Sequence, residues 1–240
     1  NRLVENKAII EGFRIINEAI NSGLLFEHIW ISEKYNSNSK ENLFFIKKLD
    51  KNNIPYSFEK DKDIQSISST KNSQGIIGLF TTHNFFNTAK EDFSNNIIIL
   101  DQISDPGNLG TIIRTCAWYD IKTIILSEST SDIFNPKCLR SGMGGHFYIK
   151  DFIYLSYNEI IDFIKLNNYK YYCSSMEGES IYNLPKEDKW VLVLGSEAHG
   201  ISNDLLFGEK ITIPRHGKID SLNVSIASGI IIDYLKKASS

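Results

Sequence analysis

The sequence predicts an α/β protein of two domains, a small one at 1–84 and a larger one at 96–240 built on a parallel sheet. Short apolar runs alternate with stretches of helical spacing along the chain. The runs at 97–100 and 190–194 are apolar at every position, which is typical of strands buried on both faces of a parallel sheet. A polar stretch at 85–95 breaks the alternation, and we place the linker there.

The first domain is predicted to be a small alternating α/β unit. A helix is expected at 6–22, because apolar residues there recur at spacings of three and four, and Gly23 is a plausible C-cap. The elements expected after this helix are a strand at 28–32, a helix at 43–49, a strand beginning at 54–56, a helix at 61–68 and a strand at 74–81.

The second domain begins with strand, turn, helix and strand between 97 and 126. Asn108 is a good N-cap residue for the helix that follows the turn. Another helix is expected at 221–237, with one apolar stripe of Val224, Ala227, Ile231 and Leu235. The elements expected between them are helices at 136–143, 158–166 and 202–206 and strands at 147–152, 169–173, 190–194 and 211–214.

Composition limits the possible functions without choosing one. The chain is 42% hydrophobic, which suffices for a sizeable core, and its formal net charge is −3. Residues 1–90 carry 12 Lys/Arg and 10 Asp/Glu, whereas residues 91–240 carry 14 and 19, so a nucleic-acid partner would need a local basic patch. No apolar run reaches the roughly 18 residues of a membrane span. Three scattered cysteines suit a reducing compartment, and we expect a cytoplasmic protein without a disulfide framework or zinc site.

Three loops that follow buried strands combine glycine or proline with polar residues, at 101–108, 195–200 and 215–223. Ligands gather at the carboxyl ends of parallel strands, and glycine lets a ligand approach the backbone. Asn108 and Arg114 are therefore placed to meet a substrate, the alternative being that Arg114 is an ordinary surface arginine. The chain has no dinucleotide-binding glycine motif, no P-loop and no histidine pair at metal-ligand spacing, so we expect no metal site.

Three segments, in this order, resemble motifs of the SpoU (TrmH) family of RNA ribose methyltransferases, within the SPOUT class. They are DPGNLG at 105–110 with Arg114 and Thr115, LVLGSEAHGI at 192–201, and Ile213-Pro214 followed by SLNVS at 221–225. The NPK segment at 135–137, with Arg140, Ser141 and Gly144, resembles a stretch common in the ribosomal RNA branch. Residues 10–12 and 74–76 resemble the N-terminal substrate-binding domain of that branch, so the resemblance covers nearly the whole chain.

The resemblance implies a 2′-O-methyltransferase that uses S-adenosylmethionine as methyl donor and RNA as substrate, with no metal. It implies a parallel α/β sheet with a deep trefoil knot, a homodimer formed through the C-terminal domain, and an RNA-binding N-terminal domain. The donor would lie against the backbone of the knot loops, near Leu194, Gly195, Gly200, Ile213, Leu222 and Val224.

The same resemblance implies catalytic roles for Asn108, Arg114, Glu197, Ser221 and Asn223. Arg114 matches the family's arginine, often assigned as general base. Because a guanidinium holds its proton tightly, we favour a role in polarising the hydroxyl or gripping the adjacent phosphate. Asn108 would hold the turn and the target nucleotide, and Glu197 would orient Arg114 or a neighbouring loop. Ser221 and Asn223 would bind the ribose or the donor. In the structural alternative, Glu197 caps a helix and Ser221 and Asn223 cap the last helix.

Three functions remain open at the level of sequence. The first is methylation of large-subunit (23S) ribosomal RNA, which the separate N-terminal domain favours. The second is the same chemistry on transfer RNA, where enzymes of the family usually carry short helical extensions instead. The third is a non-catalytic RNA-binding or ribosome assembly factor on the same fold, against which the intact Arg114, Glu197 and Asn223 argue.

Overall fold

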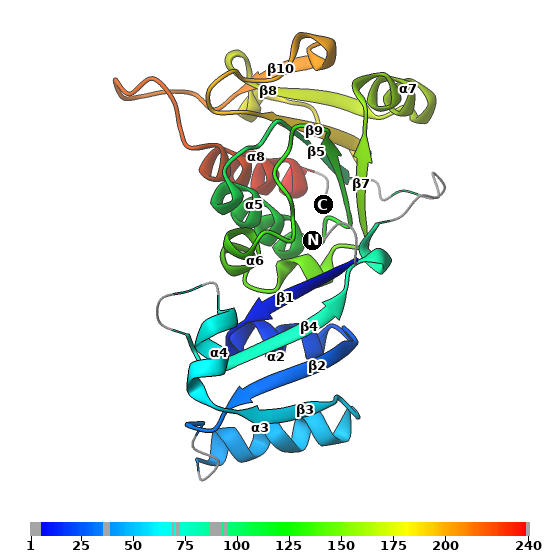
Figure 1. The fold of residues 1–240 in the computed structure, drawn as a ribbon. Helices are drawn as coiled ribbons and strands as arrows, with labels where there is room; N and C mark the ends of the chain where they lie inside the picture. Colours follow the sequence, from blue (N-terminus) through cyan, green and yellow to red (C-terminus); the bar gives the residue numbers. More distant parts are fainter. Residues whose placement is uncertain are drawn as a thin grey trace. The chain divides into compact units, whose positions relative to one another are not determined.

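The computed structural model describes residues 6–35, 39–68, 70, 73–86, 93 and 96–238. The chain divides into two compact units, Asn1–Asn84 and Phe85–Ser240, each with its own sheet and core (Figure 1). Most of the linker expected at 85–95 lies outside the described residues. None of the helices in the described ranges is long and apolar enough to cross a membrane.

The first unit is a four-stranded mixed sheet in the order β1-β4-β2-β3. Only β2 and β3 are parallel, and β4 runs antiparallel to both of its neighbours. The elements in chain order are β1 (Lys7–Glu11), α2 (Phe13–Asn21), β2 (Phe26–Ser32), α3 (Lys40–Lys51), β3 (Tyr56–Glu59), α4 (Asp61–Ile67) and β4 (Ile76–Thr81).

The helix expected at 6–22 is wrong in its first half. Residues 7–11 form β1, in which Ala8 and Ile10 are buried and alternate with half-buried neighbours. Gly12 has a φ of 111° and separates β1 from α2, a backbone conformation that favours glycine. Apolar residues at 8 and 9 followed by others at 15 and 16 fit a helical repeat by coincidence, so periodicity alone merged a strand with the helix after it.

The second unit is a six-stranded sheet in the order β10-β8-β9-β5-β6-β7, in which every neighbouring pair is parallel. This confirms the expected parallel α/β domain. Its strands are β5 (Asn96–Asp101), β6 (Thr123–Ser127), β7 (Asp151–Leu155), β8 (Lys170–Ser180), β9 (Trp190–Gly195) and β10 (Glu209–Thr212). Its helices are α5 (Pro106–Trp118), α6 (Pro136–Gly142), α7 (Tyr157–Asn167) and α8 (Val224–Ala238), with 3-10 turns at η2 (Gly145–Tyr148), η3 (Ile181–Asn183) and η4 (Asn203–Leu205).

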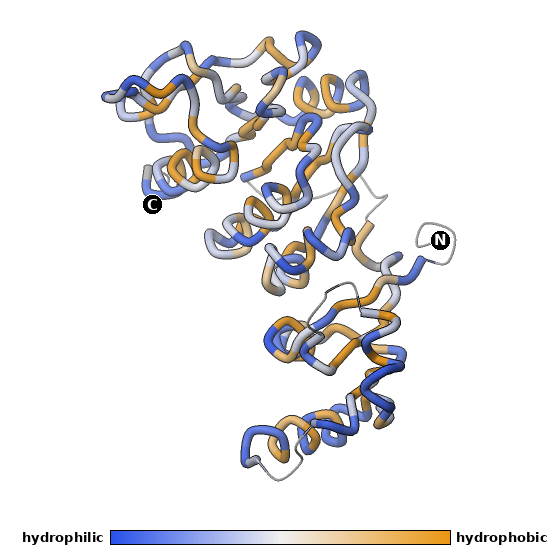
Figure 2. The backbone as a smooth tube through the Cα atoms, turned by 60° about the vertical axis from the view of Figure 1, so that its left-hand side comes forward, coloured by the Kyte–Doolittle hydropathy of each residue, from blue (hydrophilic) through white to orange (hydrophobic). Residues whose placement is uncertain are grey.

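The central strands β5 and β9 are buried at every position, as their uninterrupted apolar runs predict. Side chains alternate between the two faces, and one face packs against Ile160, Phe163 and Ile164 of α7. In Figure 1, α5, α6 and α8 lie together on the side of the sheet away from α7. Figure 2 colours the backbone by hydropathy and shows hydrophobic stretches in both units. The strand ends are thus held firmly, and the loops that follow them start from fixed positions.

The structure changes two details expected for helices α5 and α8. The N-cap of α5 is Asp105, not Asn108, and Pro106 occupies the first helical position. An Asp followed by Pro is the stronger start signal, because proline needs no hydrogen-bond partner there. On α8, Val224, Ile231 and Leu235 are buried within the chain, so the predicted stripe is internal core, whereas Ile226 and Ile230 are exposed.

Buried His146 predicts a pH dependence of stability. It lies in η2, fully buried, with Nε2 3.4 Å from Sγ of Cys138. Burial disfavours the charged ring and lowers the pKa of His146 to about 4 from 6.5. The unfolded chain therefore binds the proton first as pH falls, so stability is lost from about pH 6.5 down to 4, by up to about 3 kcal/mol. Urea unfolding of wild type and His146→Asn should diverge in pH dependence over this range, and parallel curves would contradict the assignment.

Candidate active site

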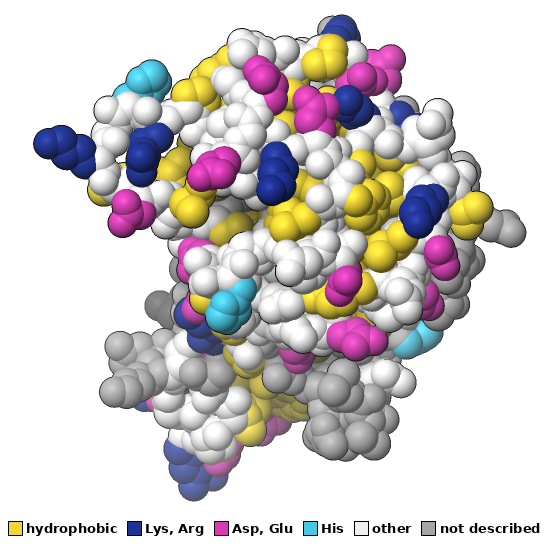
Figure 3. Space-filling model, turned by 90° about the horizontal axis from the view of Figure 1, so that it is seen from above, with side chains coloured by type: hydrophobic (Ala, Val, Ile, Leu, Met, Phe, Trp, Pro, Cys, Tyr) yellow, Lys and Arg dark blue, Asp and Glu magenta, His cyan; other side chains and the backbone are white. Residues whose placement is uncertain are grey.

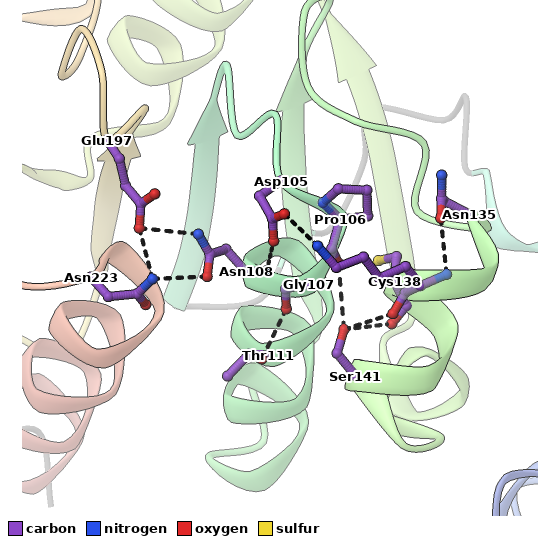
Figure 4. A network of polar contacts seen from close by, with 11 residues as sticks. Asp105, Pro106, Gly107, Asn108, Thr111, Asn135, Cys138, Ser141, Glu197 and Asn223 are labelled. Atoms are coloured by element: carbon purple, nitrogen blue, oxygen red, sulfur yellow. Dashed lines mark hydrogen bonds and ion pairs between the residues drawn. The ribbon is translucent and has the colours of Figure 1, made fainter.

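The candidate site forms at the carboxyl edge of the parallel sheet, where three loops meet. The loop after β5 runs to the start of α5, the loop after β9 spans 196–202, and the segment after β10 leads to α8. Because all six strands are parallel, their carboxyl ends lie along one edge. Figure 4 shows Asn108 on α5, Glu197 on the loop after β9, and Asn223 next to α8 facing one another.

Asn108, Glu197 and Asn223 form a closed triangle of hydrogen bonds. Asn108 Nδ2 donates to Glu197 Oε1 at 3.0 Å, and Asn223 Nδ2 donates to the same oxygen at 2.7 Å. Asn223 Nδ2 also donates to Asn108 Oδ1 at 3.0 Å. The backbone N–H of Val224 adds a third donor to Glu197 Oε1 at 3.2 Å. Three residues separated by up to 115 positions thus lock the three loops together.

The hydrogen bonds give the three residues of the triangle different roles. Asn223 only holds the loops together, whereas Glu197 and Asn108 each keep a polar group for a ligand. Both N–H groups of Asn223 are used, and its Oδ1 accepts from the backbone N–H and the hydroxyl of Ser225, so Asn223 is a helix cap and clamp. Within the described residues, Glu197 Oε2 accepts no hydrogen bond, and Asn108 keeps one N–H of its amide. A carboxylate oxygen and an amide N–H are therefore available at one fixed place.

The start of α5 is fixed by Asp105. Its Oδ1 accepts a hydrogen bond from the backbone N–H of Asn108 at 2.9 Å. Nζ of Lys137, a residue of α6, donates to its Oδ2 at 2.6 Å and forms an ion pair with it. Hydrogen bonding to Lys137, and then to the Asn108 N–H, lowers the pKa of Asp105 below its usual range. Sequence reasoning did not single out Asp105 as a candidate, although an Asp before Pro at a helix start is a recognisable N-cap signal.

Close backbone approach places α5 against α6 and η2. A Cβ on Gly110 would collide with the backbone carbonyl of Cys138 and with the Ser141 hydroxyl. A Cβ on Gly145 would lie 2.8 Å from the Cα of Arg114. Neither contact can be relieved by rotating a flexible side-chain end alone, so these two glycines fix the position of α5, and with it the backbone of Arg114.

Arg114 is exposed, and within the described ranges it forms no hydrogen bond or ion pair with any side chain, Glu197 included. It follows Asn108 by six residues, which places it about 9 Å along the helix and about 120° around it. It therefore does not face the triangle of its own chain. Trp118, one turn further on, is 84% exposed on the same side of α5.

A cavity of about 110 Å³ lies beside the triangle. It is lined by Ile103, Ser104, Asp105, Asn108, Ser196, Glu197, Ala198 and Val224. Of the residues expected to bind substrate or donor, Asn108, Glu197 and Val224 line it, whereas Leu194, Gly195, Gly200, Ile213 and Leu222 do not. Ser221 is exposed and makes no hydrogen bond within the described part of the chain. No cluster of three potential metal ligands occurs among the described residues.

The segment before α8 leaves its backbone polar groups open. Among the residues that the structure describes, no backbone N–H from 215 to 222 donates a hydrogen bond to the chain, and most of these residues are exposed. Arg215 orders part of the segment, because its Nη1 donates a hydrogen bond of 3.3 Å to the Ile219 carbonyl. Open backbone donors and acceptors suit a ligand with a heteroaromatic edge.

Asp101, at the end of β5, holds the loop after β9 in place. It was not identified from the sequence. It is fully buried at the end of β5. Its Oδ1 accepts from the Tyr157 hydroxyl at 3.0 Å, and its Oδ2 accepts from the backbone N–H of Ser202 at 2.7 Å. Gln102 Nε2 donates to the same hydroxyl at 2.7 Å. One carboxylate thus anchors the loop after β9 to the strand before α5.

The fold and the candidate site together define a class: an α/β domain with a loop-lined cavity at the edge of a parallel sheet, joined to a small mixed-sheet domain. The model of the "SpoU rRNA Methylase family" matches residues 95–233, and that of "RNA 2'-O ribose methyltransferase substrate binding" matches residues 9–86. The chain therefore belongs to the SpoU rRNA methylase family.

Relatives and solved structures agree with this assignment. The Bacillus subtilis "23S rRNA (guanosine(2553)-2'-O)-methyltransferase RlmP" is 26% identical over 98% of this chain and 90% of its own length. An "Uncharacterized tRNA/rRNA methyltransferase" of Borreliella burgdorferi is 31% identical over 75% of each chain. The crystal structure of an AdoMet-bound rRNA methyltransferase from Sinorhizobium meliloti has a TM-score of 0.83 and 24% identity, covering 98% of this chain and 89% of its own, and shows the shared fold.

Proposed function

We propose that this protein transfers a methyl group from S-adenosylmethionine to a ribose 2′-hydroxyl in RNA, with large-subunit (23S) ribosomal RNA as the substrate. The triangle of Asn108, Glu197 and Asn223 carries the proposal, since it joins the three motif loops of the family at one sheet edge. The Bacillus subtilis relative, a 23S rRNA 2'-O-methyltransferase that aligns with 98% of this chain, supports the choice of substrate.

The residues of the site fit S-adenosylmethionine. The open backbone between 215 and 222 offers donors and acceptors for an adenine edge, and Ile103 and Val224 offer apolar contact. When bound, this donor supplies a methyl group on a positively charged sulfur. Glu197 keeps one carboxylate oxygen open at the cavity wall, which favours positive charge there. We further propose that Leu194, Gly195, Gly200, Ile213 and Leu222 contribute backbone or apolar contacts, and that the segment before α8 completes a trefoil knot.

The acceptor hydroxyl needs positioning and polarisation, because a neutral ribose hydroxyl is a poor nucleophile. Asn108 keeps one amide N–H for the target nucleotide. We propose that Arg114 binds the adjacent phosphate or polarises the hydroxyl through its planar fork of donors. Ser221, exposed beside Asn223, is proposed to contact the ribose.

We propose a homodimer in which Arg114 serves the site of the second copy. Arg114 shares the exposed side of α5 with Trp118, and the neighbouring α8 exposes Ile226 and Ile230 one turn apart. Large apolar side chains left exposed on two neighbouring helices are the kind of surface that a protein interface covers. A second copy docked on α5 and α8 would cover them and bring Arg114 to a site other than its own, which accounts for its direction away from the triangle.

Transfer RNA is the second candidate substrate, since the Borreliella burgdorferi relative is named as a tRNA/rRNA methyltransferase. We favour ribosomal RNA because residues 9–86 match the RNA 2'-O ribose methyltransferase substrate-binding model, and a separate domain of this kind is expected for the ribosomal RNA branch. We also propose that the protein is cytoplasmic, since its proposed substrate is ribosomal RNA.

Methyl transfer from labelled S-adenosylmethionine to deproteinised RNA tests the proposed function. We expect the label to enter large-subunit ribosomal RNA, to map to one ribose, and to leave transfer RNA unlabelled. Label in transfer RNA alone would replace the substrate, and no label in any RNA, with a folded protein that binds the donor, would contradict the enzyme assignment.

A further inference from the structure

The outer face of α3 in the first unit carries an unusual row of side chains. Lys40, Phe44, Lys47 and Lys51, here called the α3 stripe, follow one another at spacings of four, three and four. At 100° per residue they fall within a sector of about 60°, and along the axis they span about 16 Å. Phe44 is 72% exposed, and each of the three lysines is exposed.

The α3 stripe takes no part in holding α3 to its domain. The opposite side of the helix does so, through buried Phe45 and Leu49, and Phe45 meets the ring of Phe13 edge-on at 5.4 Å. Lys48, on the inner flank, donates to the side-chain oxygens of Asn17 and Asn21 on α2. The fold therefore needs neither the exposed ring nor its three lysines, so their chemistry is available to a partner.

The three lysines are not neutralised by nearby carboxylates. Within the described residues, none of the three forms an ion pair, whereas Lys7 and Lys34 of the same unit pair with Glu27 and Asp61. The acidic residues of α3, Glu41 and Asp50, lie on either flank, each about 60° outside the α3 stripe. Asp50 also accepts a hydrogen bond from Tyr56.

The positive charge of the α3 stripe is local. On the face seen in Figure 3, basic and acidic side chains are interspersed rather than gathered into one field. Residues 1–90, which contain α3, have more Lys and Arg than Asp and Glu, in contrast to the rest of the chain. A local basic row is what binding to a polyanion requires when the whole chain is acidic.

We propose that the α3 stripe binds an unpaired segment of the RNA substrate, with a nucleobase stacked on Phe44 and the three lysines on neighbouring phosphates. An exposed ring among ammonium groups matches single-stranded RNA, whose bases are free to stack. A protein partner fits less well, because lysine is depleted in the core of protein interfaces. The inference rests on the proposed function for the identity of the RNA, and it names the surface of the first unit that receives it.

The test uses the full chain and measures RNA binding separately from methyl transfer. The variants are Phe44→Ala and the triple change of Lys40, Lys47 and Lys51 to Gln. Their matched controls are Leu25→Ala, which removes an equally exposed apolar side chain, and the triple change of Lys60, Lys62 and Lys165 to Gln. The probes are deproteinised ribosomal RNA, an unpaired oligoribonucleotide and the same oligoribonucleotide in a duplex.

We expect Phe44→Ala to weaken binding of the unpaired RNA by about tenfold and to leave duplex binding nearly unchanged. The lysine triple should lower the dependence of log K on log salt by about 2, since each lost phosphate contact removes about 0.7 for single strands. Both should raise KM for RNA while kcat at saturating RNA and donor affinity stay at wild-type values. The controls should bind RNA like wild type.

Equal RNA binding by the stripe variants and their controls would overturn the inference, even if wild type methylates RNA normally. Equal loss on unpaired and duplex RNA by Phe44→Ala would also overturn it, since stacking would not be the interaction. If wild type binds RNA but transfers no methyl group, the proposed function fails, and the binding comparison still decides the role of the α3 stripe.

Discussion

Methyl transfer by the Arg114→Ala variant should fall by about a hundred- to a thousand-fold, while the fold and donor affinity stay unchanged. The loss corresponds to about 3–4 kcal/mol, as expected for one charge-assisted contact made in the transition state. The helix should tolerate the change, because alanine is the best helix former and Arg114 is exposed. Single-turnover rates with saturating donor measure the effect, and calorimetric donor binding serves as the control.

Arg114→Lys separates the possible roles of the arginine. A lysine keeps the charge and gives up its proton more readily, but it lacks the planar fork. A general base should be partly rescued by lysine at high pH, whereas a bidentate grip on phosphate should not. Near-normal transfer by Arg114→Ala would show that Arg114 is only a surface residue.

Mixing of subunits tests whether Arg114 serves the second copy. If each site combines Arg114 of one chain with Glu197 of the other, a mixed dimer of Arg114→Ala and Glu197→Ala contains one intact site. A random mixture should then recover up to about a quarter of wild-type activity, although each variant alone is inactive. No recovery in a mixture that exchanges subunits would place both residues in the site of one chain.

Asp101→Ala should destabilise the larger unit by about 2–5 kcal/mol, since it removes a buried carboxylate and leaves two partly buried donors, the Tyr157 hydroxyl and the Ser202 N–H, without an acceptor. It should also weaken donor binding, because the loop after β9 loses its anchor to β5. Urea unfolding measures the first effect, and calorimetry under conditions where the variant is folded measures the second.

Asp204→Ala is the matched control for Asp101→Ala, since Asp204 is an exposed aspartate on η4, close in sequence to Ser202. It should change stability by less than about 0.5 kcal/mol. Tyr157→Phe, which removes one donor along with its bond, should fall between the two. An Asp101→Ala variant as stable as the Asp204→Ala control would show that the buried carboxylate contributes nothing.

The central strands of the larger unit can be predicted from local sequence, because each contains a run in which every residue is apolar. Residues 97–100 and 190–194 are apolar throughout, and both lie in the buried centre of the sheet. Local sequence does not separate β1 from α2, because a strand of five residues and a helix of nine, separated only by Gly12, share one apparent period. Tertiary pairing of β1 with β4 decides between them, and no local pattern contains that pairing.

The candidate site was harder to predict than the strands. The motifs indicated Asn108, Glu197 and Asn223 individually, but the bonds between them depend on how the sheet orders its strands. The direction of Arg114 away from this triangle depends on the rotation of α5, which Gly110 and Gly145 fix through contacts distant in sequence. Asp101 carried no signal of its own, because a single Asp after an apolar run is equally common in an exposed turn.

The most direct test of 2′-O-methylation removes the acceptor hydroxyl from the substrate. Once the methylated nucleotide is mapped, an RNA fragment is made with a 2′-deoxynucleotide at that position and compared with the all-ribose fragment at equal binding. We expect the all-ribose fragment to gain one methyl group as a 2′-O-methylnucleoside and the deoxy fragment to gain none. Transfer to the deoxy fragment, or a methyl group found on a base, would contradict it.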